Sequence, residues 1–195
     1  MDSSYYPLFL KLEGLPCLVV GGGRIAFQKA GQLVRCGARV TLASPRLVPG
    51  LRRMVSSHRI QWVARPFRPV DLKGVALAVA ATDDAAVNQL VSREARKRRI
   101  WVNVVDQPAL CTFIAPSVVR RGKLVIAIST GGASPALAKW IRKDLEKQYA
   151  AGLGRLAQAA GGVRAAVKRR VPSAAGRKRL YEKAVAAFFA VIEKG

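Results

Sequence analysis

The sequence predicts an α/β fold with a mostly parallel sheet, followed by a hairpin-plus-helix segment and a small helical C-terminal domain. Three observations support this prediction. Short apolar segments alternate with helical patterns over residues 15–115, which is typical of βαβ units. A glycine-rich turn joins the first apolar segment to the first helical pattern. Only helical periodicity follows Gly152.

Five strands are expected in the first part of the chain, at Leu15–Val20, Arg39–Ala43, Ile60–Ala64, Val75–Ala81 and Ile100–Val104. Helices are expected between them at residues 24–36, Leu47–Ser57 and Ala85–Arg98. Gly37 follows the first of these helices, where a glycine cap belongs.

The pattern changes after Asp106. Phe113–Val119 and Leu124–Ser129 are β-like, and Arg120–Lys123 between them predicts the loop of a hairpin. Ser134 and Pro135 then predict the start of a helix, as N-cap and first helical residue. We expect this helix to end near Tyr149. Two apolar stripes at helical spacing follow, and we divide the chain into residues 1–112, 113–150 and 151–195.

Composition limits the possible functions. The chain has 195 residues, of which 51% are hydrophobic, so it can bury a core. The longest apolar run, Val75–Ala81, is far shorter than a bilayer requires, and we expect no membrane partner. Three widely spaced cysteines and the lack of a secretory pattern at Met1–Tyr6 predict a cytoplasmic protein.

The formal net charge of +23 predicts anionic partners. The basic residues are spread along the chain, so a solvated surface is the simplest interpretation, with a small polyanion second and nucleic acid third. Aromatic residues make up 7% and are not interleaved with Lys and Arg, as a platform for stacked bases would require. We therefore expect no nucleic-acid partner.

Residues 19–26 fit the pattern G-x-G-x-x-A directly after a strand and at the start of a helix. In such a loop the first glycine permits a tight turn and the second lets the backbone approach a pyrophosphate. The small third residue brings helix and strand together, while the helix N-terminus attracts phosphate. Because strand and helix context are both present, this loop predicts a Rossmann-like dinucleotide site.

An acid about 20 residues further on usually binds the ribose hydroxyls. The second predicted strand instead runs into Ser44, Pro45 and Arg46. Arg46 can receive a 2′-phosphate, whereas Ser44 and backbone amides can hold an unphosphorylated ribose. On these residues alone the choice between NAD and NADP stays open.

Acidic residues follow two of the predicted strands, at the sheet edge where ligands bind in open α/β sheets. Asp84 is favoured as a helix cap because a helix begins beside it. Asp106 precedes Pro108 without an immediate helix, so we favour a functional carboxylate over a turn residue. His58, the only histidine, is expected in a surface loop. The sequence offers no catalytic triad and no metal-ligand cluster.

A second glycine-rich loop, Ser129–Pro135, joins a predicted strand to a predicted helix. Its hydroxyls and amides are compatible with an anion site. A plain helix cap with a flexible linker explains it equally well.

Together these segments resemble the precorrin-2 dehydrogenase family, the N-terminal part of siroheme synthase. The resemblance covers roughly residues 6–145. Its matching segments are Tyr6–Phe9, Val19–Arg24, Ala80–Asp84 with Val87–Asn88, Asn103–Asp106, Phe113–Ser117 and Ile128–Pro135. The Asn-Val-Val-Asp and Ser-Thr-Gly-Gly-x-Ser-Pro segments are the specific ones.

The resemblance implies a homodimer that oxidises precorrin-2 to sirohydrochlorin with NAD; some family members also insert Fe²⁺. It implies a catalytic role for Asp106, and a dimerisation role for residues 113–150. Cofactor contacts are expected at Gly21, Gly22, Gly23, Arg24, Ile25, Pro45, Arg46, Thr82 and Asp83, and substrate contacts at Ser129, Thr130, Gly131 and Gly132. The alternatives are a non-catalytic nucleotide-sensing Rossmann module and a nucleic-acid-binding protein.

Overall fold

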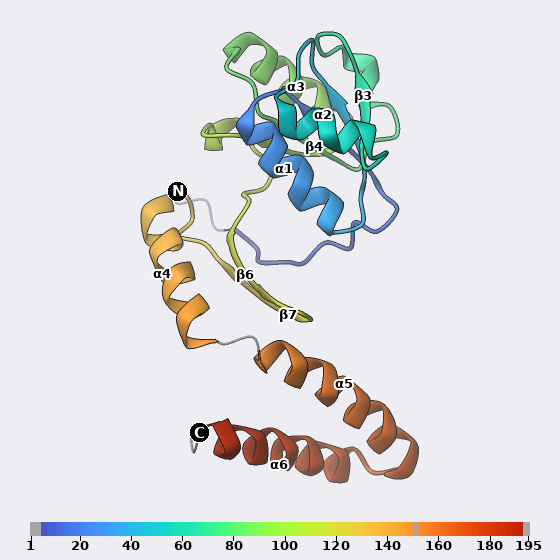
Figure 1. Ribbon diagram of the computed structural model, residues 1–195, viewed down its shortest axis with the longest axis vertical. Coiled ribbons are helices and arrows are strands. Elements are labelled where there is room, and N and C mark those ends of the chain that lie inside the picture. Colours follow the sequence, from blue (N-terminus) through green and yellow to red (C-terminus); the bar gives the residue numbers. More distant parts are fainter. Residues whose placement is uncertain (1–4, 150–151, 193–195) are drawn as a thin grey trace. The chain divides into compact units, whose positions relative to one another are not determined.

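The computed structural model describes residues 5–149 and 152–192 (Figure 1). The chain divides into two compact units, residues 1–115 and 116–195. Two sequence-based expectations concern positions outside the described residues. One is the predicted domain boundary between residues 150 and 151. The other is the expected lack of a secretory pattern at the N-terminus, of which the first four residues are not described.

The first unit is built on a five-stranded parallel sheet with the order β3-β2-β1-β4-β5. Its strands are β1 (Pro16–Val20), β2 (Arg39–Ala43), β3 (Gln61–Val63), β4 (Leu77–Ala80) and β5 (Trp101–Val104). From β1 the chain moves outward through β2 to β3, then crosses back to add β4 and β5 on the other side. The predicted α/β fold is confirmed, and each strand lies within two residues of its predicted bounds.

Helices cover both faces of this sheet. They are α1 (Arg24–Arg35), α2 (Pro49–Ser56), α3 (Ala85–Lys97) and the short 3-10 helices η1 (Pro69–Leu72) and η2 (Pro108–Leu110). Ala26, Ala30 and Leu51 of α1 and α2 are fully buried in one core cluster. Val91 and Ala95 of α3 are fully buried in the other. The sheet is therefore covered by helices from both sides, as in doubly wound folds.

The central strand β1 shows why its sequence is apolar throughout. Cys17 and Val19 belong to the core cluster beneath α1 and α2, whereas Leu18 and Val20 belong to the cluster beneath α3. Side chains alternate between the two faces of a strand, so a strand covered on both faces has no solvated side.

The second unit contains a hairpin and three helices. Strands β6 (Ser117–Arg121) and β7 (Leu124–Ile128) pair antiparallel, and the helices are α4 (Pro135–Gln148), α5 (Gly152–Arg170) and α6 (Ala174–Ile192). Contacts join α4 to both strands of the hairpin and α5 to α6. The predicted hairpin, its following helix and the helical region are confirmed.

The hairpin differs from the prediction at both ends of β6. The predicted strand at Phe113 begins only at Ser117, because the Asn103 side chain holds the Phe113 carbonyl at 3.1 Å beside β5. The predicted loop Arg120–Lys123 is wrong, since both arginines belong to β6 and the loop is Gly122–Lys123. Gly122 has a φ of +57°, which glycine adopts without strain.

Arg121 stays in the strand because its guanidinium reaches the C-terminal end of α4. It donates to the carbonyls of Glu146 and Tyr149 at 2.9 and 3.0 Å. These carbonyls lack partners within the helix, and a cation there is favourable.

Among the described helices, none combines the length and apolar character needed to cross a membrane.

Glu94 ties together the basic end of α3. Its carboxylate accepts from Lys97 at 2.8 Å and from Arg98 at 2.7 Å, and lies 3.5 Å from Arg93. The hydrogen bonds from Lys97 and Arg98 lower the pKa of Glu94 from 4.5 to about 2. The carboxylate therefore stabilises the fold above its unfolded-state pKa, and this contribution is lost as the pH falls towards 2.

We expect Glu94→Gln to lower the melting temperature by a few degrees at pH 7, because three cations lose their common acceptor. The difference from the wild type should be smaller at pH 3, where the unfolded-state carboxyl is protonated. Thermal unfolding of both proteins at the two pH values measures this. Glu182→Gln is the matched control, since Glu182 makes only an exposed pair with Lys178 at 3.9 Å. Equal losses at both pH values would contradict the assignment.

Candidate functional site

The loops after β1 and β4 meet at the point where the strand order reverses. Gly21 follows β1 with a φ of +121°, and a Cβ built there would lie 2.2 Å from the Ala81 carbonyl oxygen. The Ala81 amide donates to the Val20 carbonyl at 2.8 Å, and this bond extends the pairing of β1 with β4 beyond the strand ends. In doubly wound sheets ligands bind at this reversal, outside the carboxyl ends of the strands. Gly21 is thus required both by its positive φ and by the close approach of the Ala81 backbone.

The next two glycines differ sharply in their surroundings. A Cβ at Gly22 would lie 1.8 Å from the Arg46 carbonyl oxygen and 2.5 Å from the Ser44 hydroxyl. A Cβ at Gly23 would meet nothing within 4 Å. Sequence reasoning placed the glycine requirement on Gly21 and Gly23 and named Gly22 only as an expected cofactor contact. The packing of the β2 end against this loop is a tertiary contact that the motif does not report.

The N-terminal end of α1 is suited to a phosphate. Gly23 is its N-cap residue and has no side chain with which to cap the first amides, and the first turn contains no acid. Those amides have no partner within a helix, and the helix dipole favours a negative charge there. Open space at Gly23 and free amides at the start of α1 together fit the pyrophosphate of a dinucleotide.

The residues after β2 form a small fixed turn beside this loop. The Ser44 hydroxyl donates to the Arg46 carbonyl at 2.8 Å, and the Trp62 indole donates to the Ser44 carbonyl at 2.8 Å. Ser44 is buried, whereas Pro45 and Arg46 are exposed. Of the two candidates for the ribose, the Arg46 side chain is therefore free to reach a ligand. The Ser44 hydroxyl already has a partner in the turn.

The predicted contacts after β4 belong to the start of α3. Thr82 accepts from the Asp84 amide at 3.0 Å, and its carbonyl accepts from the Asn88 side chain at 2.9 Å. Asp84 is the N-cap of α3 and accepts from the amides of Ala86 and Val87, so its predicted capping role is confirmed. Asp83 is exposed.

Asp106 lies in a tight turn directly after β5. Its φ is +58°, and the Gln107 amide donates to the Val104 carbonyl at 3.3 Å across the turn. The Val105 amide donates to the Ala80 carbonyl at 3.0 Å, and this bond places the turn beside the end of β4. The Asp106 residue is exposed. A positive φ is uncommon for residues other than glycine, although aspartate adopts it more readily than most, and His58 and Arg99 share it in this chain.

Lys29 is a feature of this edge that sequence reasoning did not identify as functional. It lies half-buried on α1, between the buried Ala26 and Ala30. Burial lowers the pKa of Lys29, while the nearby charges of Asp106 and Cys111 act in the opposite direction. The signal in the sequence was a lysine within an apolar helical stripe. The Lys29 ammonium therefore lies close enough to the candidate carboxylate for the two charges to interact.

The second glycine-rich loop joins β7 to α4 in the second unit. Gly131 and Gly132 have φ values of +65° and +95°. Its hydroxyls largely serve the loop itself, since Ser129 accepts from the Gly131 amide at 3.1 Å and Thr130 from the Ser134 amide at 2.9 Å. Ser134 also caps α4, as predicted. Fewer amides remain for an anion than the sequence suggested.

Three family models match the chain. Residues 8–117 match a family described as "Putative NAD(P)-binding". Residues 121–148 match "Sirohaem biosynthesis protein central", and residues 152–193 match "Sirohaem synthase dimerisation region". The first match covers more than half of the chain. The chain belongs to this NAD(P)-binding family.

Relatives are similar over nearly the whole chain. The siroheme synthase of Methylobacillus flagellatus is 49% identical over 90% of this chain and 38% of its own length. Siroheme synthase 1 of Aeromonas salmonicida is 44% identical over 94% of this chain and 39% of its own. The solved structure titled "SirC, precorrin-2 dehydrogenase" has a TM-score of 0.78 and 28% identity, covering 98% of this chain and all of that chain.

These matches confirm the resemblance to the N-terminal part of siroheme synthase. The chain spans about two fifths of the length of the curated relatives. Within this member of the NAD(P)-binding family, the first unit brings the glycine loop, Arg46, Thr82 and Asp106 to one edge of the sheet. The predicted substrate loop belongs to the other unit. Among the described residues there is no group of three or more metal-ligating side chains.

We expect Gly22→Ala and Gly23→Ala to separate folding from nucleotide binding. Gly22→Ala should lower the free energy of unfolding by about 2 kcal/mol, because its Cβ cannot be accommodated without moving Arg46. Gly23→Ala should fold normally, since its backbone is extended and its surroundings are open. It should weaken NADH binding about tenfold by blocking the approach of the pyrophosphate. Urea denaturation and NADH fluorescence titration measure the two effects, and equal destabilisation would contradict this account.

Proposed function

We propose that this chain oxidises precorrin-2 to sirohydrochlorin with NAD as hydride acceptor. The observation that carries the proposal is the position of Asp106. Its carboxylate follows β5 at the edge of the sheet where the glycine loop and the start of α1 lie, with the Lys29 ammonium nearby. A base and a dinucleotide site at one edge are what a dehydrogenation requires.

The relatives support this reaction class. One solved structure with the same fold is titled a precorrin-2 dehydrogenase, and its whole length is covered by this chain. The curated relatives are named siroheme synthases, of which this chain matches about two fifths.

The chemistry needs both a hydride and a proton to leave the substrate. The bound nicotinamide supplies the hydride acceptor. Asp106 takes the proton as general base, which typically accelerates a reaction by ~10²–10⁴-fold. Lys29 on α1 is attracted to the Asp106 carboxylate, and this attraction opposes the lowering of the pKa of Lys29 by burial. The amides at the start of α1 orient the pyrophosphate.

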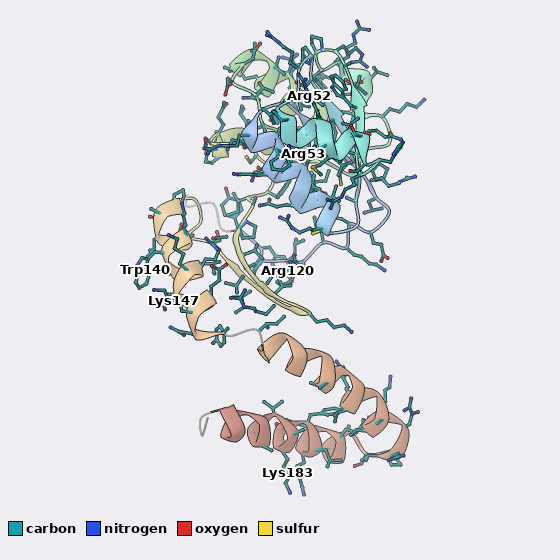
Figure 2. All side chains as sticks on the ribbon, viewed as in Figure 1. Arg52, Arg53, Arg120, Trp140, Lys147 and Lys183 are labelled. Atoms are coloured by element: carbon teal, nitrogen blue, oxygen red, sulfur yellow. The ribbon has the colours of Figure 1, made fainter. Side chains whose placement is uncertain are left out.

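The charge of the chain favours the same substrate. Precorrin-2 is a tetrapyrrole that carries several carboxylates, and a protein of net charge +23 attracts it from solution. Arg52 and Arg53 on α2 illustrate how basic side chains extend from the first unit (Figure 2). Exposed charges of this kind increase the rate of encounter more than the final affinity.

Fe²⁺ insertion into sirohydrochlorin is a second step supported by the relatives' name, siroheme synthase. In this step the iron is a substrate. Asp106 can take the protons that leave the pyrrole nitrogens as the metal enters.

Anaerobic turnover of precorrin-2 tests the main proposal, with NAD and NADP in parallel. We expect NADH absorbance at 340 nm to rise together with the sirohydrochlorin spectrum, and added Fe²⁺ then tests the second step. A chain that binds a nucleotide but turns over no precorrin-2 would instead be a nucleotide-sensing module. Binding to nucleic acid with a steep salt dependence and no response to NAD would indicate the third alternative.

We expect Asp106→Asn to reduce kcat by about 10²-fold or more, because the general base is lost. Asparagine tolerates a positive φ, so this variant keeps the turn that alanine would disturb. NADH affinity and melting temperature are the controls and should stay at wild-type values. Wild-type turnover in this variant would remove Asp106 from the mechanism.

We also propose that the chain acts as a homodimer, with the second unit supplying the interface. Residues 152–193 match a dimerisation region, and α4 carries Leu137 and Trp140 at 49% and 66% exposure. Trp140 projects outward from α4 (Figure 2). Large exposed apolar side chains grouped on one helix favour association.

Sedimentation velocity at micromolar concentration should show twice the chain mass of 21.0 kDa. Trp140→Ala should shift the population towards monomer. Trp101→Ala, which removes a half-exposed tryptophan from β5 in the first unit, should not. A wild-type monomer at these concentrations would rule out the dimer.

A further inference from the structure

The turn that carries Asp106 is continuous with the segment that follows it. Asp106 is the third residue of the turn Val104–Gln107, with a φ of +58°. A positive φ at this position is favoured by glycine and is also adopted by aspartate. Because the Asp106 residue is exposed, the position of its carboxylate follows that of the turn and of the segment after it.

Two side chains of α3 bind the carbonyls of the segment after the turn. The Ser92 hydroxyl donates to the Leu110 carbonyl at 2.7 Å. The Arg96 guanidinium donates to the carbonyls of Ala109 and Cys111 at 3.2 and 2.9 Å. Three successive carbonyls at the end of η2 are thus held by one face of one helix.

The two side chains also support each other. Arg96 Nε donates to the Ser92 hydroxyl at 3.3 Å, so the serine bridges the arginine and the Leu110 carbonyl. Ser92 is 2% exposed, and its hydroxyl needs a partner at that depth. Arg96 contributes charged hydrogen bonds from an exposed position, and Ser92 contributes a shorter hydrogen bond from a buried one.

Cys111 closes the segment back onto the residue before the turn. Its sulfur accepts from the Val104 amide at 3.1 Å and lies 3.4 Å from the Gln107 carbonyl. The Val104 amide precedes Asp106 by two residues. A displacement of Cys111 therefore moves the turn that bears the carboxylate.

We infer that Ser92 and Arg96 are positioning residues that fix Asp106 through η2 and Cys111. They touch neither the glycine loop nor the proposed base, and act only through the intervening backbone. We call the hydrogen bonds from Ser92 and Arg96 to the carbonyls of residues 109–111 the clamp. The effect of the clamp on catalysis rests on the proposed function, whereas the existence of the clamp does not. Two measurements test the clamp and its catalytic effect separately.

The first measurement follows the reactivity of Cys111 in the full-length chain. Release of the clamp opens the segment locally and exposes the sulfur. We expect Arg96→Ala to increase the iodoacetamide alkylation rate of Cys111 roughly tenfold, as the loss of charged hydrogen bonds implies. Exposed Cys36 is the internal reference and should react at the wild-type rate. Burial raises the pKa of Cys17 to about 11, so it stays largely unreactive.

The matched control is Arg93→Ala on the same helix. Arg93 is exposed and makes only a 3.5 Å contact with Glu94. It should leave Cys111 alkylation and turnover unchanged. Arg96→Lys, which retains a charged donor, should give intermediate values, and Ser92→Ala should increase alkylation in the same way as Arg96→Ala.

The second measurement is precorrin-2 turnover. Arg96→Ala should lower kcat roughly tenfold, with the KM for NAD and the melting temperature near wild-type values. In the Asp106→Asn background the same change should cause no further loss, because the carboxylate it positions is already absent. A merely structural role would lower activity equally in both backgrounds.

The outcomes are distinct. Unchanged Cys111 alkylation in Arg96→Ala, or an equal rise in Arg93→Ala, overturns the clamp. Faster alkylation with wild-type turnover overturns the positioning role. If the wild-type chain turns over no precorrin-2 with either nucleotide, the proposed function fails, and the positioning role fails with it. The alkylation rates still decide the clamp.

Discussion

A single close approach of backbone to backbone determines where the parts of the candidate site lie. At the end of β1 the chain passes the Ala81 carbonyl so closely that a Cβ on Gly21 would lie 2.2 Å from its oxygen. A side chain there would force the loop away from β4 and lift the start of α1 off the sheet. Ala26, fully buried in the first turn of α1, depends on the same approach. The free amides of the helix end, the β2 turn at Arg46 and the turn after β5 are arranged around this contact.

The chain has 34 basic and 11 acidic residues, and Asp106 differs from the acidic residues of the first unit that form ion pairs or cap a helix. Asp71 is bound by Arg65 at 2.6 Å, Asp84 caps α3, and Glu94 joins three cations. Each of these carboxylates is explained by local structure. Asp83 and Asp106 lie instead at the carboxyl edge of the sheet, where both are exposed, and Asp106 has a positive φ. The half-buried Lys29 is a cation whose charge interacts with that of Asp106.

Most of the fold could be predicted from the sequence, because the patterns that indicate strands, helices and turns are local. Apolar runs, the glycine loop and the Ser134-Pro135 start each depend on neighbouring residues, and strands and helices appeared close to their predicted bounds. What it could not show depends on contacts between distant segments. Gly22 is required by the Arg46 carbonyl, Arg121 remains in β6 through the end of α4, and the charge of Lys29 on α1 interacts with that of Asp106 after β5. A pattern of spacing contains no information on any of these pairs. The position of Asp106 at the sheet edge could be predicted, because strand ends in parallel sheets gather at one edge.

Helix α3 connects two of the segments that the proposed reaction needs. Its first turn is fixed by Asp84 and by Asn88, which holds the Thr82 carbonyl at the end of β4. Two turns further along, Ser92 and Arg96 hold the segment that follows Asp106. The helix is anchored to the sheet by Val91 and Ala95, both fully buried, so it acts as a rigid frame between them. The proposed dinucleotide site and the proposed base are thereby supported by one element rather than by two independent loops. Because α3 is packed on the sheet along its length, the two segments that it holds keep a fixed separation.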